Sequence, residues 1–174
     1  MSFQAFEAWI KAPALKQVAA HWNDVRLDRL MPSWSDLKPS CIAAHLSNVW
    51  SFRYDAESDI FLGRLVGDRI ARHIGKSFHG LPLDEAYPPE ARAWAKTVFK
   101  RVVTEPALYG HLGIIFKQMG QLGGGERIVL PLASDGLHAD GILGATIFEP
   151  VLDAPVTLIP PSEGTERWFP LQAK

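Results

Sequence analysis

The chain has 174 residues, of which 47% are hydrophobic and 21% are charged, values typical of a chain that folds around a hydrophobic core. Its 18 basic and 19 acidic residues give a formal charge of −1, and no Lys/Arg cluster argues for nucleic acid or an anionic membrane as a partner. The single cysteine, Cys41, excludes an internal disulfide and any metal site built from several cysteines. The length fits one domain.

The N-terminal stretch resembles neither a secretion signal nor a membrane span. Glu7 and Lys11 interrupt its apolar residues, and it has neither a basic leader nor a small-residue cleavage site. No uninterrupted apolar run in the chain reaches membrane-spanning length. We therefore expect a cytoplasmic protein, which the shortage of cysteine fits.

Residues 1–22 are predicted to form an amphipathic N-terminal helix, because apolar residues recur there at intervals of three and four. Pro13 should bend this helix or split it into two. Such an aromatic face needs a cover, either the protein's own sheet or a second subunit. We interpret it as a homodimer contact made by Phe3, Phe6, Trp9 and Ile10.

Residues 23–149 are predicted to form the main domain. It begins with a brief helix after Pro39, followed by a hairpin of two strands, 49–54 and 60–66, rich in β-branched and aromatic residues. A short helix over 68–74 follows, closed by a glycine.

The second half of the domain contains the clearest helical pattern in the chain, between Pro88 and Pro106. Three extended segments follow, at 108–118, 127–133 and 142–148. Two strands, a block of helices and three strands predict an α+β fold with one five-stranded antiparallel sheet and helices on one face. The proline-rich tail, 150–174, is predicted to be irregular.

Glycines, prolines and apolar residues recur in a characteristic order between Trp22 and Phe148. They are Pro32, Asp36, Leu37, Pro39, Leu46, Phe61, Arg64, Leu65, Gly67, Gly75, Gly80, the run from Glu126 to Leu132, and Gly144. In these residues the chain resembles the PAS-like family of short, often stand-alone bacterial proteins, found mainly in alphaproteobacteria. The resemblance implies a PAS fold and a sensory or regulatory role, and it leaves the ligand open.

In a PAS-like fold, the space between the sheet and its helices is either filled or holds a small molecule. The candidate pocket residues are Trp50, Phe52, Arg64, Leu65, His73, Ile74, Phe78, Trp94, Val98, Ile115 and Leu130. Arg64 and Arg127 each interrupt an apolar strand, which predicts that both face solvent. We interpret both as structural, paired with Glu126 or Asp68. The alternative is an anchor for an acidic ligand group.

The sequence specifies no cofactor. The Asn-Cys-Arg-Phe cluster of flavin-adduct PAS domains is absent, and Cys41 is interpreted as a small packing residue. Haem is not expected, because the spacing of His73 and His79 does not distinguish either as an axial ligand. The chain also lacks zinc-site spacing and a G-x-S-x-G nucleophile motif.

We expect a sensory or regulatory module, not an enzyme, that binds a small ligand, a protein partner or both and signals by association. Its partner would be an unknown regulatory protein, and the module itself a homodimer. A small α+β enzyme that uses the same cavity is one alternative, favoured by a polar cavity that contains His73, His79 or Arg64. A ligand-free structural adaptor is the other, favoured by a filled core and an exposed aromatic helix.

Overall fold

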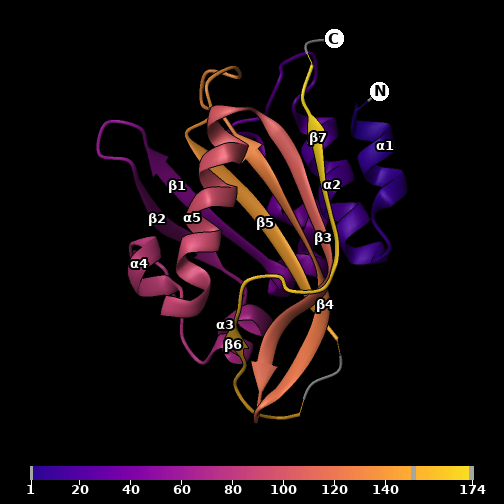
Figure 1. The fold of residues 1–174 in the computed structure, drawn as a ribbon. Helices are drawn as coiled ribbons and strands as arrows, with labels where there is room; N and C mark the ends of the chain where they lie inside the picture. Colours follow the sequence, from indigo (N-terminus) through magenta and orange to yellow (C-terminus); the bar gives the residue numbers. More distant parts are fainter. Residues whose placement is uncertain (1, 150–151, 173–174) are drawn as a thin grey trace.

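The computed structural model describes residues 2–149 and 152–172, which form one antiparallel sheet between helices (Figure 1). The strands are β1 Val49–Asp55, β2 Ile60–Val66, β3 Ala107–Gln118, β4 Gln121–Leu132, β5 Gly141–Phe148, β6 Thr157–Leu158 and β7 Gly164–Pro170. Five of them lie in the order β2-β1-β5-β4-β3, and β6 and β7 both pair with β3. The predicted α+β class and the five antiparallel strands are confirmed.

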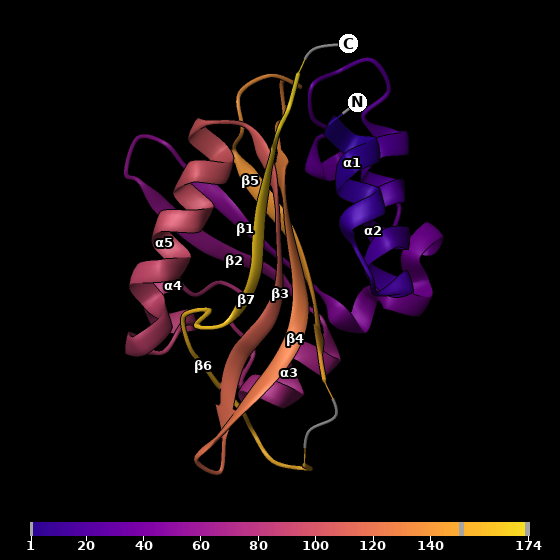
Figure 2. The same cartoon turned by 45° about the vertical axis from the view of Figure 1, so that its right-hand side comes forward.

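Helices cover both faces of this sheet. They are α1 Ser2–Trp9, α2 Pro13–Val25, α3 Asp68–Ile74, α4 Leu83–Ala86 and α5 Pro89–Thr104, with the 3-10 helices η1 Trp34–Asp36 and η2 Pro39–Asn48. Figure 2 shows α4 and α5 on one side of the sheet and α1 and α2 on the other. The central strands are therefore enclosed between two layers.

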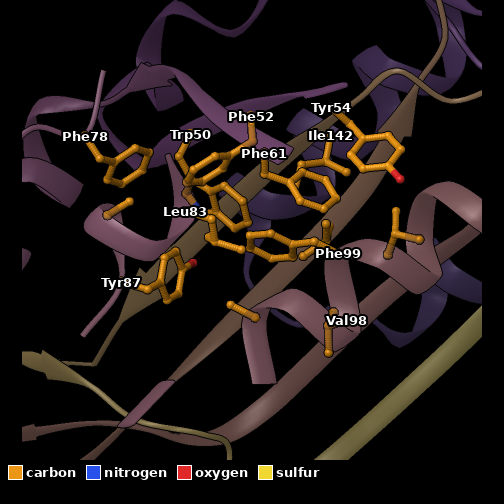
Figure 3. Close-up of a cluster of buried hydrophobic side chains, with 14 of the residues drawn as sticks. Trp50, Phe52, Tyr54, Phe61, Phe78, Leu83, Tyr87, Val98, Phe99 and Ile142 are labelled. Carbon is orange, nitrogen blue, oxygen red and sulfur yellow. The ribbon is translucent and has the colours of Figure 1, made fainter. Parts of the chain in front are cut away.

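The core beneath α4 and α5 is rich in aromatic side chains (Figure 3). Helix α5 begins with Pro89 in its first turn and presents a buried stripe to the sheet, made of Ala91, Ala95, Val98, Phe99 and Val102. The Phe99 ring centroid lies 5.3 Å from that of Trp50 and 5.7 Å from that of Phe52. Aromatic pairs at such distances add about 0.5–1.5 kcal/mol each beyond the burial of their area.

The opposite face of the sheet is covered by α1 and α2. The chain leaves the helical conformation at Ile10, and Pro13 starts α2, so the N-terminal segment forms two helices. Trp22 of α2 is fully buried, and its Nε1 donates a hydrogen bond to the Pro131 carbonyl oxygen of β4 at 2.8 Å. The N-terminal helices are thus part of the domain core.

The side chains expected to form a homodimer contact are turned toward the protein's own sheet. Phe3, Phe6 and Ile10 are buried there, and the half-buried Trp9 packs against Phe169 of β7 with 6.4 Å between ring centroids. The expectation of an exposed aromatic contact is corrected, because the sheet and β7 provide the cover that such a face needs. The homodimer itself stays a prediction.

The C-terminal segment, predicted to be irregular over 150–174, adds strands to the sheet. β7 pairs with β3 along its whole length, from Ala107↔Pro170 to Gly113↔Gly164. Its one proline stands at the end of an edge strand, where the missing N–H costs no ladder hydrogen bond. Residues 150, 151, 173 and 174 of the predicted tail lie outside the described residues.

Glu126 of β4 connects the sheet to the turn between α1 and α2. Its side-chain oxygens accept hydrogen bonds from the backbone N–H groups of Lys11 and Ala12, at 2.8 and 2.7 Å. The residue is 4% exposed, so the carboxylate depends on these two donors. They hold the start of α2 against β4.

We expect Glu126→Gln to lower the free energy of unfolding by about 2 kcal/mol, because the amide replaces one acceptor with a donor that faces a backbone N–H. Urea titration followed by tryptophan fluorescence measures this change. Glu57→Gln, in the exposed β1–β2 turn, is the matched control and should change stability by less than about 0.5 kcal/mol. Equal effects of the two substitutions would contradict the role of Glu126.

Candidate functional site

Polar side chains lie in register across the face of the sheet that α5 covers. Thr146 of β5 is paired with Arg127 of β4, and Arg127 is paired with His111 of β3. His111 is paired in turn with Glu166 of the edge strand β7. Directly paired residues on antiparallel strands point to the same face, so these four form one row across the sheet.

Arg127 is the centre of this row and is 1% exposed. Its guanidinium lies 4.6 Å from the ring centroid of Trp94 on α5. Both Nε and Nη1 are buried without a hydrogen-bond partner, and within residues 2–149 and 152–172 no carboxylate forms an ion pair with this side chain. The buried charge of Arg127 therefore has a cation–π contact with Trp94 in place of the hydrogen-bond acceptor that a buried charge ordinarily has.

A small cavity lies beside Arg127, between the sheet and the short helices. Its lining residues are Trp50, Ile70, Ile74, Phe78, Tyr87, Arg127, Thr146, Phe148 and Leu158. Its volume is about 10 Å³, the room of a single water molecule. The lining residues with polar side-chain groups include Arg127, Tyr87 and Thr146, and Thr146 Oγ1 accepts a hydrogen bond from Trp50 Nε1 at 2.9 Å.

Trp50 of β1 reaches Thr146 of β5 because the β5 residue paired with Trp50 is a glycine. Gly144 is paired with Trp50, and a Cβ at this position would lie 2.2 Å from the indole ring. The glycine thus allows the ring to lie flat over β5. Phe78 also lines the cavity and stacks on Phe52, with 5.0 Å between ring centroids (Figure 3).

Helix α3 closes the cavity on the side away from the sheet and contributes Ile70 and Ile74. The helix has seven residues and ends at Gly75, which takes a left-handed conformation. The backbone N–H of Val156 donates to the His73 carbonyl oxygen of α3, and β6 lies beside this helix in Figure 1. The cavity is thus bordered by one short helix that also contacts the C-terminal segment.

The electrostatics of the polar row leave Arg127 as its only positive charge at neutral pH. Burial, together with the nearby charge of Arg127, lowers the pKa of His111 from 6.5 to about 4, against an opposing effect of Glu166. Burial also raises the pKa of Tyr109, whose hydroxyl donates to Glu166 Oε2 at 3.1 Å. Glu166 Oε1 accepts from Trp168 Nε1, so both carboxylate oxygens have donors on the outer strands.

Several of the predicted pocket residues lie in the core beside this cavity. Trp50, Phe52, Phe78 and Val98 are buried there, and the half-buried Ile74 and Trp94 pack against them. Of these six, Trp50, Ile74 and Phe78 line the cavity itself.

The other predicted pocket residues do not line this cavity. Leu65 and Leu130 face the N-terminal helices, and Ile115 belongs to a separate small cluster with Phe116 and Val156. His73 packs its ring on Phe148 from α3, with 4.9 Å between centroids. Strand alternation turns neighbouring residues to opposite faces, so the predicted set divides between the two sides of the sheet.

Arg64 and Arg127 occupy different surroundings from those expected. Arg64 is half-buried on β2, with its guanidinium 4.7 Å from the Trp34 ring centroid, and neither arginine forms the predicted ion pair with Glu126 or Asp68 in the described part of the chain. Arg127 points into the core, because helices cover both faces of β4. The run Ile128–Leu132 is apolar at odd and even positions alike, which is the pattern of a strand buried on both faces. This pattern in the sequence could have predicted that the adjacent Arg127 is buried.

Two further hollows lie away from the polar row. An open groove of about 590 Å³ between the β1–β2 turn, α4 and α5 is bordered by the ion pairs Lys100–Asp59 and Lys96–Asp84. A smaller hollow of about 100 Å³ under η1 and η2 is lined by aliphatic side chains, Leu65 among them, and by Trp34. Both lysines of the groove are paired with carboxylates, and in the described part of the chain neither hollow is lined by an arginine.

Comparison with known proteins agrees with this architecture. A family model described as PAS domain matches residues 10–147. The chain belongs to the PAS domain family. Membership confirms the predicted resemblance to PAS domains and makes the chain, in general terms, a sensory or regulatory module. No curated protein and no solved structure matches this PAS domain.

Among the described residues, no group of three or more His, Cys, Asp or Glu side chains is placed to hold a metal ion. Cys41 is exposed, not packed as the sequence suggested. Among residues 2–149 and 152–172, no helix has the length and apolar character needed to cross a membrane.

His111 makes the stability of the fold depend on pH in a defined window. The unfolded chain binds a proton on this side chain near pH 6.5 and the folded chain only near pH 4, so the unfolded state binds more protons between these values. Stability should therefore fall as the pH drops from 6.5 to 4, by up to about 3 kcal/mol from this group. His111→Gln should flatten the dependence in urea titrations across this range. Parallel curves for wild type and variant would contradict the assignment.

Proposed function

We propose that this PAS domain binds a small molecule in the cavity beside Arg127, and that a protein partner reads the resulting change in the helices around it. The observation that carries the proposal is a buried guanidinium, without an ion-pair or hydrogen-bond partner at Nε or Nη1, on the wall of a small cavity. An unpaired buried charge is costly, and ligand pockets combine an apolar wall with few polar groups.

Helix α3 is the element through which ligand binding would change the protein. The cavity holds about one water molecule, so a larger ligand must displace the side chains of Ile70 and Ile74. Movement of α3 would reach the C-terminal segment through the hydrogen bond between Val156 and His73. The ligand would thus favour one position of α3 and its attached strand over another.

The composition of the lining favours binding over catalysis. Its nine side chains include no carboxylate, histidine, lysine or cysteine, and the Thr146 hydroxyl accepts from an indole instead of donating to a base. The enzyme alternative would need an acid or base in the cavity, and His73, His79 and Arg64 are not among its lining residues. Tyr87 is, but burial raises its pKa, which makes it a weaker acid. In a ligand-free adaptor, the buried Arg127 donors at Nε and Nη1 would never gain a hydrogen-bond acceptor.

The output of the module is proposed to be association with a regulatory protein or with a second copy of the chain. A homodimer contact through Phe3, Phe6 and Ile10 is not part of this proposal, because these side chains are buried within the chain. A cytoplasmic location remains our expectation from the sequence.

Native mass spectrometry of protein purified without denaturation tests the binding proposal. We expect an added small mass on the wild type, and its absence from Ile74→Trp, because the larger indole fills the cavity. Leu122→Trp at the exposed tip of the β3–β4 hairpin is the matched control and should retain the added mass.

Hydrogen exchange supplies the second readout. Removal of the ligand should accelerate amide exchange in α3 and at Val156 and leave α2 unchanged. A wild type that carries no added mass, both as purified and after incubation with the metabolite fraction of the expressing cells, would contradict the proposal.

A further inference from the structure

We infer that the ligand of this cavity is a singly charged organic carboxylate whose oxygens bind the guanidinium of Arg127, an inference that rests on the proposed function and names its ligand chemistry. It follows from three features of the molecule: the unpaired charge, the neutrality of its neighbours and the apolar remainder of the cavity wall.

The first feature is the cost of the buried charge. Arg127 is 1% exposed, and a charged group withdrawn from water costs several kcal/mol unless an opposite charge or hydrogen-bond acceptors replace the water. The Trp94 ring face, 4.6 Å away, supplies at most about 2 kcal/mol of cation–π attraction. Neither Nε nor Nη1 has an acceptor. A carboxylate is the acceptor that a guanidinium binds with the best geometric match.

The second feature is the charge of the surroundings, which limits the ligand to one negative charge. Thr146 is uncharged, burial raises the pKa of Tyr87 and keeps its hydroxyl neutral, and the depressed pKa of His111 leaves that side chain neutral at pH 7. Glu166 lies two strands from Arg127 in the row, about 10 Å away by strand spacing, and its oxygens are held by Tyr109 and Trp168. One carboxylate would neutralise Arg127, whereas a phosphate dianion would leave an uncompensated charge in the core.

The third feature is the rest of the lining, which is mainly apolar. Ile70 and Ile74 of α3, with Phe78, Phe148 and Leu158, line the same space, together with the aromatic residues Trp50 and Tyr87. These side chains suit a short aliphatic tail. Thr146 Oγ1 accepts from Trp50 and, among the described residues, donates in no hydrogen bond, so its proton is available to a ligand oxygen.

The test compares sodium butyrate with butyramide, which has nearly the same shape and no charge, by isothermal titration calorimetry on the full chain. We expect butyrate to bind the wild type and butyramide to bind at least about 10-fold more weakly. Arg127→Met should weaken butyrate binding at least about 30-fold, because it removes one partner of a buried charge pair.

Arg127→Met also separates a ligand anchor from a structural arginine. Replacing an uncompensated buried charge with an apolar side chain of similar length should leave the melting temperature of the ligand-free protein unchanged or raise it. A marked fall in melting temperature, or failure of the variant to fold, would show that Arg127 also acts in folding, and the Nε–H signal of Arg127 in nitrogen-15 spectra of the wild type then decides. A shift of this signal on addition of butyrate but not of butyramide supports the inference, and the absence of a shift overturns it.

The outcomes separate this inference from the proposed function. Equal binding of butyramide and butyrate would leave the cavity as a ligand site and overturn the carboxylate. Failure of butyrate to bind, or unchanged binding by Arg127→Met, would overturn the carboxylate as well. Native mass spectrometry decides independently whether the cavity holds a ligand at all.

Discussion

Strand β4 is covered on both faces, and this double burial decides the role of every polar side chain that it carries. Glu126 and Arg127 are neighbours in sequence and therefore face opposite layers of the domain. The carboxylate of Glu126 has two backbone N–H groups as partners, which the turn between α1 and α2 supplies. The guanidinium of Arg127 has an aromatic ring and a small cavity. One constraint thus produces both a structural connection and an unpaired charge.

In the proposed function, the unpaired charge connects the fold to ligand sensing. A ligand changes a protein only to the extent that it binds one conformation better than another. A partner for Arg127 can bind only in a form of the domain in which the cavity has opened, and α3 is the short element that borders it. Because α3 is also joined to the C-terminal segment through Val156, occupancy of the cavity and the position of that segment would depend on each other.

The two ends of the described chain contribute to one core, although parts of both lie outside residues 10–147, the region that matches the PAS family. The Phe6 ring of α1 lies 5.3 Å from that of Phe169 on β7. On the other face of β7, Trp168 packs against Tyr109 with 4.8 Å between ring centroids and lies 4.1 Å from the Arg101 guanidinium. A shift of the C-terminal segment would therefore alter side-chain contacts on both faces of the sheet.

The sequence by itself determined the five strands, helix α5 and their order, because each depends on a local signal: β-branched and aromatic runs between turn residues for the strands, and apolar spacing of three to four for the helix. It also identified Trp50, Ile74 and Phe78 as cavity residues. The tertiary structure alone decided that β7 pairs with β3, since an edge strand forms only where a distant partner offers its hydrogen bonds. It decided as well that Arg127 points inward and Phe6 is covered. Alternation shows which residues share a face, but only the packing of distant segments decides whether that face meets water.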